Sequence, residues 1–423
     1  MALAGMVDSL MVSSIGAYAV AAVGLTTQPK FIALAMFTAL NVAVSAIVAR
    51  RKGQNDRKSA NQVMMLALVF VVIAGIIVSA LGVIFADPII RLCGSNADTH
   101  DSAVLYFRII VGGMIFNIFS LAINAAQRGS GKTKIAMKTN VTSNVVNMIG
   151  NYLLIEGHFG FPALGVRGAA IATVFGTVIA CIMSILSIVP KDNFLSIPYI
   201  IKEKVKLSME PARGIFRISS NIFLEQILMR IGFMSVAVMA AKMGTEAFAA
   251  HQVGMNVMSL SFSFGDGMQV AAVALIGRSL GEQNPQLAKI YGNICQRMGN
   301  VISVVLSVLY LLGGRFLYHL YFQEEEIIAI GVEIMQVMVL IVLLQIAQVI
   351  YMGCLRGAGD VLFTTVASTL SVTIVRPVAS YVLCYMLGFG IIGIWFGVVA
   401  DQMCRLVLTT WRFKSGVWTK VRI

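Results

Sequence analysis

The chain has 423 residues, of which 58% are hydrophobic and only 12% are charged, and its mean hydropathy is +0.86. A soluble domain of this size needs far more polar surface, so the composition excludes a soluble enzyme and indicates an integral membrane protein with many spans. The net charge of +13 would suit a nucleic-acid partner only if the basic residues formed one patch, and they do not.

Apolar runs separated by Gly, Pro, Asn and charged residues predict twelve spans. In chain order these are 1–14, 28–49, 60–86, 102–126, 139–156, 165–189, 215–241, 248–277, 290–314, 329–353, 361–385 and 391–412. The 190–214 segment, with three prolines and several lysines, predicts an amphipathic cytoplasmic linker on the lipid headgroups, and 413–423 is expected to be a cytoplasmic tail.

The basic residues mark one side of the membrane, because 24 of the 32 Lys and Arg lie in alternate connections. They comprise five in 50–58, four in 128–138, six in 191–217, three in 278–297, Arg356, and five in 405–422. This is the positive-inside pattern, so these connections are expected to be cytoplasmic and no nucleic-acid partner is implied.

The chain contains an internal repeat with a fixed offset of 228 residues. The sequence QRGSGKT at 127–133 returns as LRGAGDV at 355–361, and the same offset relates Asn41 to Gln269, Arg50 to Arg278 and Gly165 to Gly393. A register held without gaps indicates duplication. Because each half has an even number of spans, the predicted fold is all-α, with two parallel six-helix repeats: an N-terminal lobe at 1–189 and a C-terminal lobe at 215–412.

The first expected span is too short. Residues 1–14 reach roughly 21 Å, against a hydrocarbon core of about 30 Å. We therefore expect the natural chain to be longer at its N-terminus, by at least 13 residues if the repeat partner begins near Ile215.

Two motifs that suggest other chemistry do not support it. The GSGKT run at 129–133 lacks the first glycine of a P-loop, where Ala126 stands, and its repeat copy lacks the lysine. We interpret both copies as cytoplasmic turns whose glycines allow tight geometry and whose arginines face lipid phosphate or a helix C-terminus. The six cysteines are scattered without a CxxC pair, so they suggest neither a disulfide framework nor a metal site. Apart from H⁺ or Na⁺ no cofactor is expected, and no enzymatic activity is expected.

Ionisable residues within the spans are the strongest functional candidates, because a charge at the centre of a helix costs roughly 2.5–3.5 kcal/mol on insertion scales. They are Asp8, Glu225, Arg230, Asp266, Arg376 and Asp401.

Several roles are open for the members of this set. Asp401 and Arg405 are four residues apart and predict a local ion pair. Arg230 and Arg376 either neutralise carboxylates of the same bundle or contact substrate. Asp266 either lines a central cavity or pairs with an arginine.

A second polar set centres on Asp8 in the first span. Asn147 and Asn151 share a face of the fifth span, and Thr173 is expected near the same depth on the sixth. One carboxylate, two amides and a hydroxyl suit a proton or Na⁺ site. The alternative is a hydrogen-bonded network that only holds the bundle together.

The chain resembles bacterial members of the multidrug and toxic compound extrusion (MATE) family over essentially its whole length. The likeness rests on the paired RGxG turns and on four longer stretches: GMVDSLMVSSIG at 5–16, NMIGNYLLIEGHFGFPALGVRGAAIAT at 147–173, LEQILMRIG at 224–232 and GTEAFAAHQVG at 244–254.

The resemblance implies a monomeric transporter of the bacterial plasma membrane that exports organic cations or other amphipathic compounds against H⁺ or Na⁺ by alternating access. Asp8, Asn147, Thr173 and Glu225 match the family's cation-coupling residues, whereas Asn151 stands where many relatives have Asp. Because the set then has one acid fewer, H⁺ is favoured over Na⁺ as the coupling ion. A flippase for a lipid-linked oligosaccharide or cell-wall precursor is the alternative, and a structural or sensory membrane protein is a third.

Overall fold

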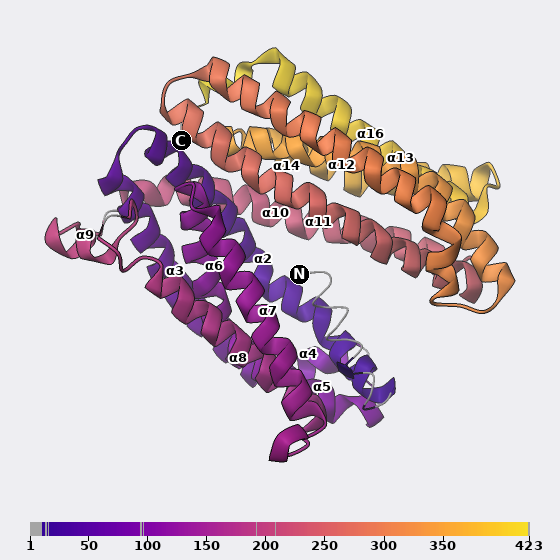
Figure 1. Ribbon diagram of the computed structural model, residues 1–423. Coiled ribbons are helices and arrows are strands. Elements are labelled where there is room, and N and C mark those ends of the chain that lie inside the picture. Colours follow the sequence, from indigo (N-terminus) through magenta and orange to yellow (C-terminus); the bar gives the residue numbers. More distant parts are fainter. Residues whose placement is uncertain are drawn as a thin grey trace. The chain divides into compact units, whose positions relative to one another are not determined.

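The computed structural model describes residues 11–12, 15, 17–93, 95, 97–191, 193–207 and 209–421. This part of the chain is helical and contains no strand. It divides into two compact units, unit 1 (residues 1–219) and unit 2 (residues 220–423), which are considered separately below (Figure 1). The first expected span, together with Asp8, falls almost entirely outside the described residues.

Unit 1 contains the second to sixth expected spans. Its helices are α2 (Ala17–Gly53), α3 (Arg57–Ile84), α4 (Ala86–Leu92), α5 (Ala97–Gly112), α6 (Met114–Gly129), α7 (Thr133–Ile155), α8 (Gly165–Leu186) and α9 (Ile197–Lys202). The fourth span, expected as one helix, is instead α5 and α6, bent by 44° at Gly113. The short helix α4 was not expected.

Unit 2 contains most of α10 (Glu210–Ala241) and the helices that follow it. These are α11 (Thr245–Gly281), α12 (Pro285–His319), α13 (Glu325–Ala358), α14 (Val361–Thr369), α15 (Arg376–Tyr381) and α16 (Gly390–Ser415). The eleventh span, 361–386, is helical throughout but widens into π-helix at Leu370–Val375 and Val382–Met386. The first widening directly precedes Arg376 and Pro377, and a proline cannot donate the backbone hydrogen bond of a regular helix.

Among the described residues, nine helices are long and apolar enough to cross a membrane, or ten if the bent α5 and α6 pair is one span. Helix α7 is not among them, although it occupies the fifth expected span, because its sequence carries four asparagines. Helices such as α3 and α12 expose long rows of isoleucine, valine and leucine, including Ile76 and Leu312. Such surfaces suit contact with lipid tails, so this is a multi-pass membrane protein.

The two RGxG turns have the same backbone geometry, which explains why their glycines repeat. Gly131 and Gly359 adopt left-handed φ angles of 89° and 88°, a conformation that costs glycine little. The other two pack backbone to backbone: a Cβ on Gly129 would lie 2.5 Å from the Ser45 carbonyl oxygen. A Cβ on Gly357 would lie 2.7 Å from the Val273 carbonyl oxygen. Position 273 corresponds to position 45 through the repeat offset, so the two contacts are equivalent.

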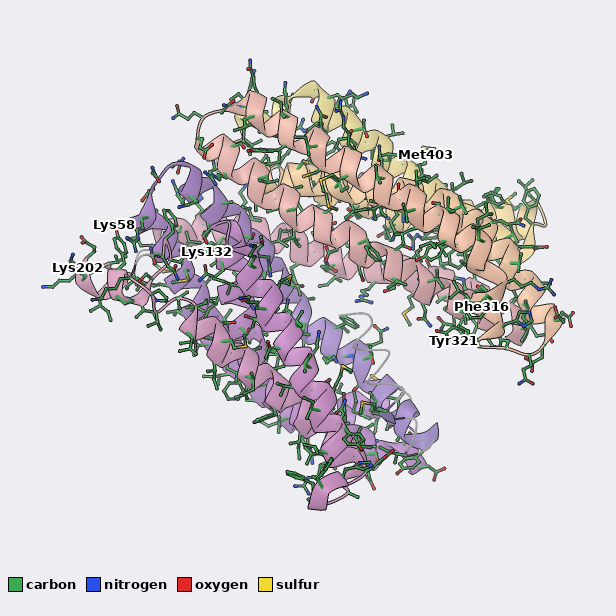
Figure 2. The ribbon with its side chains drawn as sticks, viewed as in Figure 1. Lys58, Lys132, Lys202, Phe316, Tyr321 and Met403 are labelled. Atoms are coloured by element: carbon green, nitrogen blue, oxygen red, sulfur yellow. The ribbon has the colours of Figure 1, made fainter. Side chains whose placement is uncertain are left out.

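The segment after α8 folds back onto unit 1 through Arg57, at the start of α3. The Arg57 guanidinium donates hydrogen bonds to the carbonyl oxygens of Lys191 (2.8 Å), Asn193 (2.6 Å) and Phe194 (3.1 Å). Lys132 also donates to the Asn193 side chain. In Figure 2 the labelled Lys58, Lys132 and Lys202 gather at one end of this unit, as expected for a cytoplasmic face.

Helix α3 begins with a side-chain cap. The Asp56 Oδ1 accepts a hydrogen bond of 3.0 Å from the Ser59 backbone N–H, which satisfies one free donor at the helix start. Partial burial acts to raise the pKa of Asp56, but the hydrogen bonds from Ser59, together with the charges of Arg51 and Lys58, hold the pKa below its usual value.

Candidate functional site

Helices α7 and α8 bring together two of the residues expected to couple cations. The Asn147 Nδ2 donates a hydrogen bond of 3.1 Å to the Thr173 Oγ1, and the Thr173 hydroxyl donates to the Ala169 carbonyl at 2.9 Å. Asn147 and Asn151, four residues apart on α7, are both buried. Two members of the predicted polar set, Asn147 and Asn151, are therefore buried in unit 1, and Thr173 is half-buried beside them. The fourth member, Asp8, is outside the described residues.

Glycines allow the close approach that makes this contact. A Cβ on Gly176 of α8 would lie 2.7 Å from the Ser143 carbonyl oxygen, and one on Gly150 of α7 would lie 2.9 Å from the Ala172 Cβ. Small residues at such contacts let helix backbones pack tightly in membranes. The asparagine and threonine can therefore bond directly across the helix pair.

A cavity of about 120 Å³ adjoins this pair in unit 1. Thr173 belongs to both the cavity wall and the hydrogen-bonded pair. The remaining lining comes from four elements: α2, α5, α6 with the preceding Gly113, and α8. These residues are Lys30, Leu34, Ile110, Gly113, Met114, Asn117, Val174 and Thr177.

Lys30 is a cavity residue that the sequence analysis missed. It follows Pro29 near the beginning of the second expected span, 28–49, and a basic side chain there was the available signal. What the sequence does not disclose is that helices α2, α6 and α8 enclose a common space.

In unit 2, Glu225 of α10 forms a buried ion pair with Arg356 of α13. The Arg356 Nη2 donates to the Glu225 Oε1 at 2.7 Å, and the Glu225 side chain is only 1% exposed. Its second oxygen, Oε2, accepts no hydrogen bond from the described residues. The expectation that Arg356 faces lipid phosphate or a helix C-terminus is therefore wrong, because this arginine turns inward to compensate a buried carboxylate.

A second ion cluster centres on Asp401 of α16. The Asp401 Oδ2 accepts hydrogen bonds from the Arg376 Nη2 (2.5 Å) and Nε (3.1 Å) and from the Arg405 Nη2 (2.9 Å). The Arg376 guanidinium also lies 4.5 Å from the centroid of the Phe233 ring, a cation–π contact. The structure thus contains the Asp401–Arg405 ion pair that the spacing predicts, and Arg376 pairs with the same carboxylate.

The repeat relates this cluster to the polar pair of unit 1, since position 401 is position 173 displaced by 228. Unit 1 has a hydroxyl bonded to an amide where unit 2 has a carboxylate bonded to two arginines. The duplicated sites have therefore diverged into a neutral pair and a fixed ion cluster.

The other two ionisable candidates lie on exposed surface of unit 2. Asp266 of α11 and Arg230 of α10 both have exposed side chains. The alternatives for Asp266, a cavity lining or a partner for arginine, stay predictions, as does the role of Arg230.

These features define a multi-pass membrane protein built from a duplicated set of helices, with polar groups buried inside its spans. Its sequence matches the family model MatE over residues 1–153 and 222–382. The chain belongs to the MATE family of transporters, and it is a multi-pass protein of the bacterial plasma membrane.

Similar proteins extend over nearly the whole chain. A probable multidrug resistance protein NorM of Thermotoga maritima is 27% identical, with 98% of this chain and 89% of that protein covered. An uncharacterized transporter, YisQ, of Bacillus subtilis is 26% identical, with 98% and 90% covered.

Solved structures share the fold. One, reported as the outward-facing conformation of a multidrug resistance MATE family transporter of the MOP superfamily, has a TM-score of 0.90 at 21% identity, with 98% of this chain and 92% of that chain covered. Another is a MOP superfamily transporter from Pyrococcus furiosus, whose report describes a reversed polarity of the binding pocket. It has a TM-score of 0.90 at 21% identity and covers 99% of this chain and 93% of that one.

Proposed function

We propose that this protein is a secondary active exporter that exchanges organic cations or other amphipathic compounds for H⁺. In this proposal the lobes at 1–189 and 215–412, joined by the 190–214 linker, rock to open a central space alternately to each side of the membrane. The observation that carries it is the Asn147–Thr173 hydrogen bond, between a buried asparagine and a half-buried threonine, beside a cavity in unit 1. The name of the NorM relative, a probable multidrug resistance protein, supports the same substrate class.

A proton is favoured over Na⁺ by the state of the acids in unit 2. Sodium needs several oxygen ligands and persistent negative charge, but Asp401 is engaged by two arginines and Glu225 by one. On the sequence pattern, Asp8 is the acid of the unit 1 set, because Asn151 is neutral. A single carboxyl that gains and releases a proton is sufficient for H⁺ exchange.

Glu225 is the second coupling group in this proposal. Its buried Oε2 accepts no hydrogen bond from the described residues, and in this proposal a proton bound there weakens the ion pair with Arg356. Because Arg356 belongs to the RGxG turn at the end of α13, proton binding at Glu225 would loosen α10 from that turn. Loss of an ion pair on protonation is a physical route from proton binding to helix movement.

Exchange stoichiometry limits the driving force. A monovalent organic cation exchanged for one H⁺ moves no net charge, so the membrane potential, worth about 2.3 kcal/mol per 100 mV, does not contribute. A difference of one pH unit supplies about 1.4 kcal/mol, enough for roughly tenfold accumulation.

The proposal also includes contact with membrane lipid and a monomeric state. Around α9, Ile201 and Met209 are 70% and 71% exposed, and the sequence between them carries Lys202, Lys204 and Lys206. Alternating apolar and basic side chains suit the surface of an anionic leaflet.

Substitution of Asp8 tests the proposed function. Asp8→Asn should abolish efflux of a fluorescent organic cation from cells while leaving the protein abundant in the membrane, because the amide cannot titrate. Asp87→Asn, at an exposed acid of α4, is the matched control and should retain efflux. Unchanged efflux in Asp8→Asn would assign Asp8 to structure and remove it from the coupling scheme.

A further inference from the structure

The connection between α7 and α8, residues 156–164, presents apolar side chains at one end of unit 1. Phe159 is 86% exposed and Phe161 is 49% exposed, and Pro162 and Ala163 are exposed beside them. The connection projects from the end of unit 1 opposite α9 (Figure 1). We call residues 156–164 the outer loop, because the lysines that mark the cytoplasmic face gather at the other end (Figure 2).

Phe159 adopts a backbone conformation that is unusual for a bulky residue. Its φ angle is 56°, in the left-handed region that glycine adopts readily and large side chains rarely do. Gly157 and Gly160 on either side also have positive φ angles, of 78° and 83°. Strain of this kind persists only where the surrounding structure holds it, and it is often found at functional positions. The outer loop thus directs a phenyl group outward at a position where glycine would be less costly.

Contacts at the base of the outer loop hold it in one shape. The Leu164 backbone N–H donates to the Leu154 carbonyl oxygen at 2.9 Å, which closes the loop. The His158 ring stacks on the Tyr152 ring of α7, with 4.1 Å between the ring centroids. The His158 Nδ1 also lies 2.9 Å from the Tyr152 carbonyl oxygen. Phe159 is therefore presented by a preformed loop.

The outer loop continues an apolar stripe on α7. The members of this stripe recur at intervals of three and four positions, so they share one helix face, and each is at least 37% exposed. They are Met137, Val141, Val145, Met148, Ile149 and Tyr152. An apolar face of this kind on a multi-pass protein contacts lipid tails. Because His158 stacks on Tyr152, the outer loop begins where this lipid-facing stripe ends.

The length of α7 places the outer loop at the far edge of the membrane. The helix begins just after the cytoplasmic RGxG turn at 128–131, and its 23 residues extend roughly 34 Å, against a hydrocarbon core of about 30 Å. Polar groups lie at the base of the loop: the Glu156 and His158 side chains approach to 3.7 Å, and Arg167 is exposed at the start of α8. An apolar tip with polar groups at its base suits the boundary between lipid tails and headgroups.

We propose that the outer loop binds the outer leaflet of the membrane, with the Phe159 and Phe161 side chains inserted just below the lipid headgroups. The contact goes beyond the exchange reaction proposed above and does not depend on which compound is transported. Its partner is lipid because the loop extends a lipid-facing stripe at the depth where that stripe reaches the headgroups. The preformed loop lowers the cost of insertion, since the phenyl groups are already directed outward before they meet lipid.

A tryptophan at the tip of the loop reports its surroundings. Phe159→Trp would be made in a Trp411→Phe background, because Trp411 is 62% exposed whereas Trp395 and Trp418 are fully buried. The full-length protein would be placed in phosphatidylcholine nanodiscs, whose two faces are both open to the buffer. Lipid brominated on the upper part of its acyl chains quenches tryptophans inserted to that depth, and acrylamide quenches those in water.

We expect brominated lipid to lower the emission of the new tryptophan at least about twofold, because an inserted aromatic ring reaches the depth of the bromine atoms. Acrylamide should quench it weakly. The emission of the Trp411→Phe background alone would be subtracted. Phe161→Trp provides a second reporter at an ordinary extended backbone, with a φ angle of −76°, and should give the same result if Phe159→Trp disturbs the loop.

Gln323→Trp in the same background is the matched control. Gln323 is exposed in the connection between α12 and α13, which also lies on the outer side by the positive-inside pattern. Three acids, Glu324, Glu325 and Glu326, follow it and favour water over lipid. Its tryptophan should therefore be quenched by acrylamide and little affected by brominated lipid.

Two outcomes would overturn the proposal. Tryptophans at 159 and 161 that are quenched by acrylamide as strongly as the one at 323, without quenching by brominated lipid, would place the outer loop in water. Tryptophans at 159 and 161 shielded from both quenchers would place the loop against protein, such as a second copy of the chain.

Discussion

Replacing Asp401 with asparagine should be strongly destabilising, because it removes the shared counter-ion of two buried arginines. The Asp401 side chain is 0% exposed, Arg376 is 1% exposed and Arg405 is 5% exposed. The wild-type cluster has one carboxylate and two guanidinium groups, so the substitution leaves two buried positive charges without a carboxylate partner.

The expected magnitude follows from burial. Breaking a buried ion pair by removing one partner costs about 3–5 kcal/mol. For a unit of roughly 200 residues, each kcal/mol corresponds to about 2–4 °C in Tm. We therefore expect Asp401→Asn to lower the Tm by about 10 °C in thermal unfolding of the purified protein, followed by intrinsic fluorescence.

A control and a rescue make the test specific. Glu325→Gln breaks the ion pair between Glu325 and Arg315, whose two side chains are 68% and 66% exposed, respectively. Exposed ion pairs contribute only about 0–1 kcal/mol to stability. Adding Arg376→Met to Asp401→Asn removes one of the two uncompensated charges and should raise the Tm again. The reasoning is refuted if Asp401→Asn costs no more than Glu325→Gln, or if the added Arg376→Met lowers the Tm further.

Three further outcomes are expected. Arg356→Gln should lower the Tm, because it leaves the buried Glu225 carboxylate without its arginine partner. Adding Glu225→Gln to this variant should restore most of the lost Tm, and additive losses in the double variant would contradict the pairing. Asp56→Ala should cost about 1 kcal/mol at neutral pH. The pKa of Asp56 in the folded state lies below the usual value of an aspartate, so the stabilisation is present above that usual value and is lost as pH falls through the folded-state pKa. A difference in stability that does not depend on pH would contradict this. Replacing Lys202 of α9, and Lys204 and Lys206 after it, with glutamine should reduce the gain in transport on adding phosphatidylglycerol to phosphatidylcholine vesicles. An unchanged gain would exclude lipid contact through these three lysines.

Local patterns in the sequence predicted much of the architecture. The offset of 228 correctly implied that the two RGxG turns are equivalent, and both left-handed glycines lie where it requires. The spacing of Asp401 and Arg405 predicted their ion pair because residues four apart share a helix face. Hydropathy did not reveal the break at Gly113 or the π-helical stretches of 361–386, which depend on local backbone geometry.

Contacts between distant segments were not accessible in the same way. Glu225 and Arg356 are 131 residues apart, and no periodicity pairs one acid with one particular arginine across that distance. Lys30 contributes to a cavity only because α2, α6 and α8 pack around a common space. The sequence identified which residue types were expensive to bury, and tertiary packing determined their neighbours.

Proton-driven transport in proteoliposomes tests the central claim most directly. Purified protein would be reconstituted in sodium-free buffer, and uptake of a fluorescent organic cation would be followed after an imposed pH gradient, with Asp8→Asn as the paired variant. The proposal predicts uptake that requires the pH gradient, reverses direction with it and is absent in Asp8→Asn. Uptake that ignores the pH gradient and appears only with a Na⁺ gradient would contradict proton coupling.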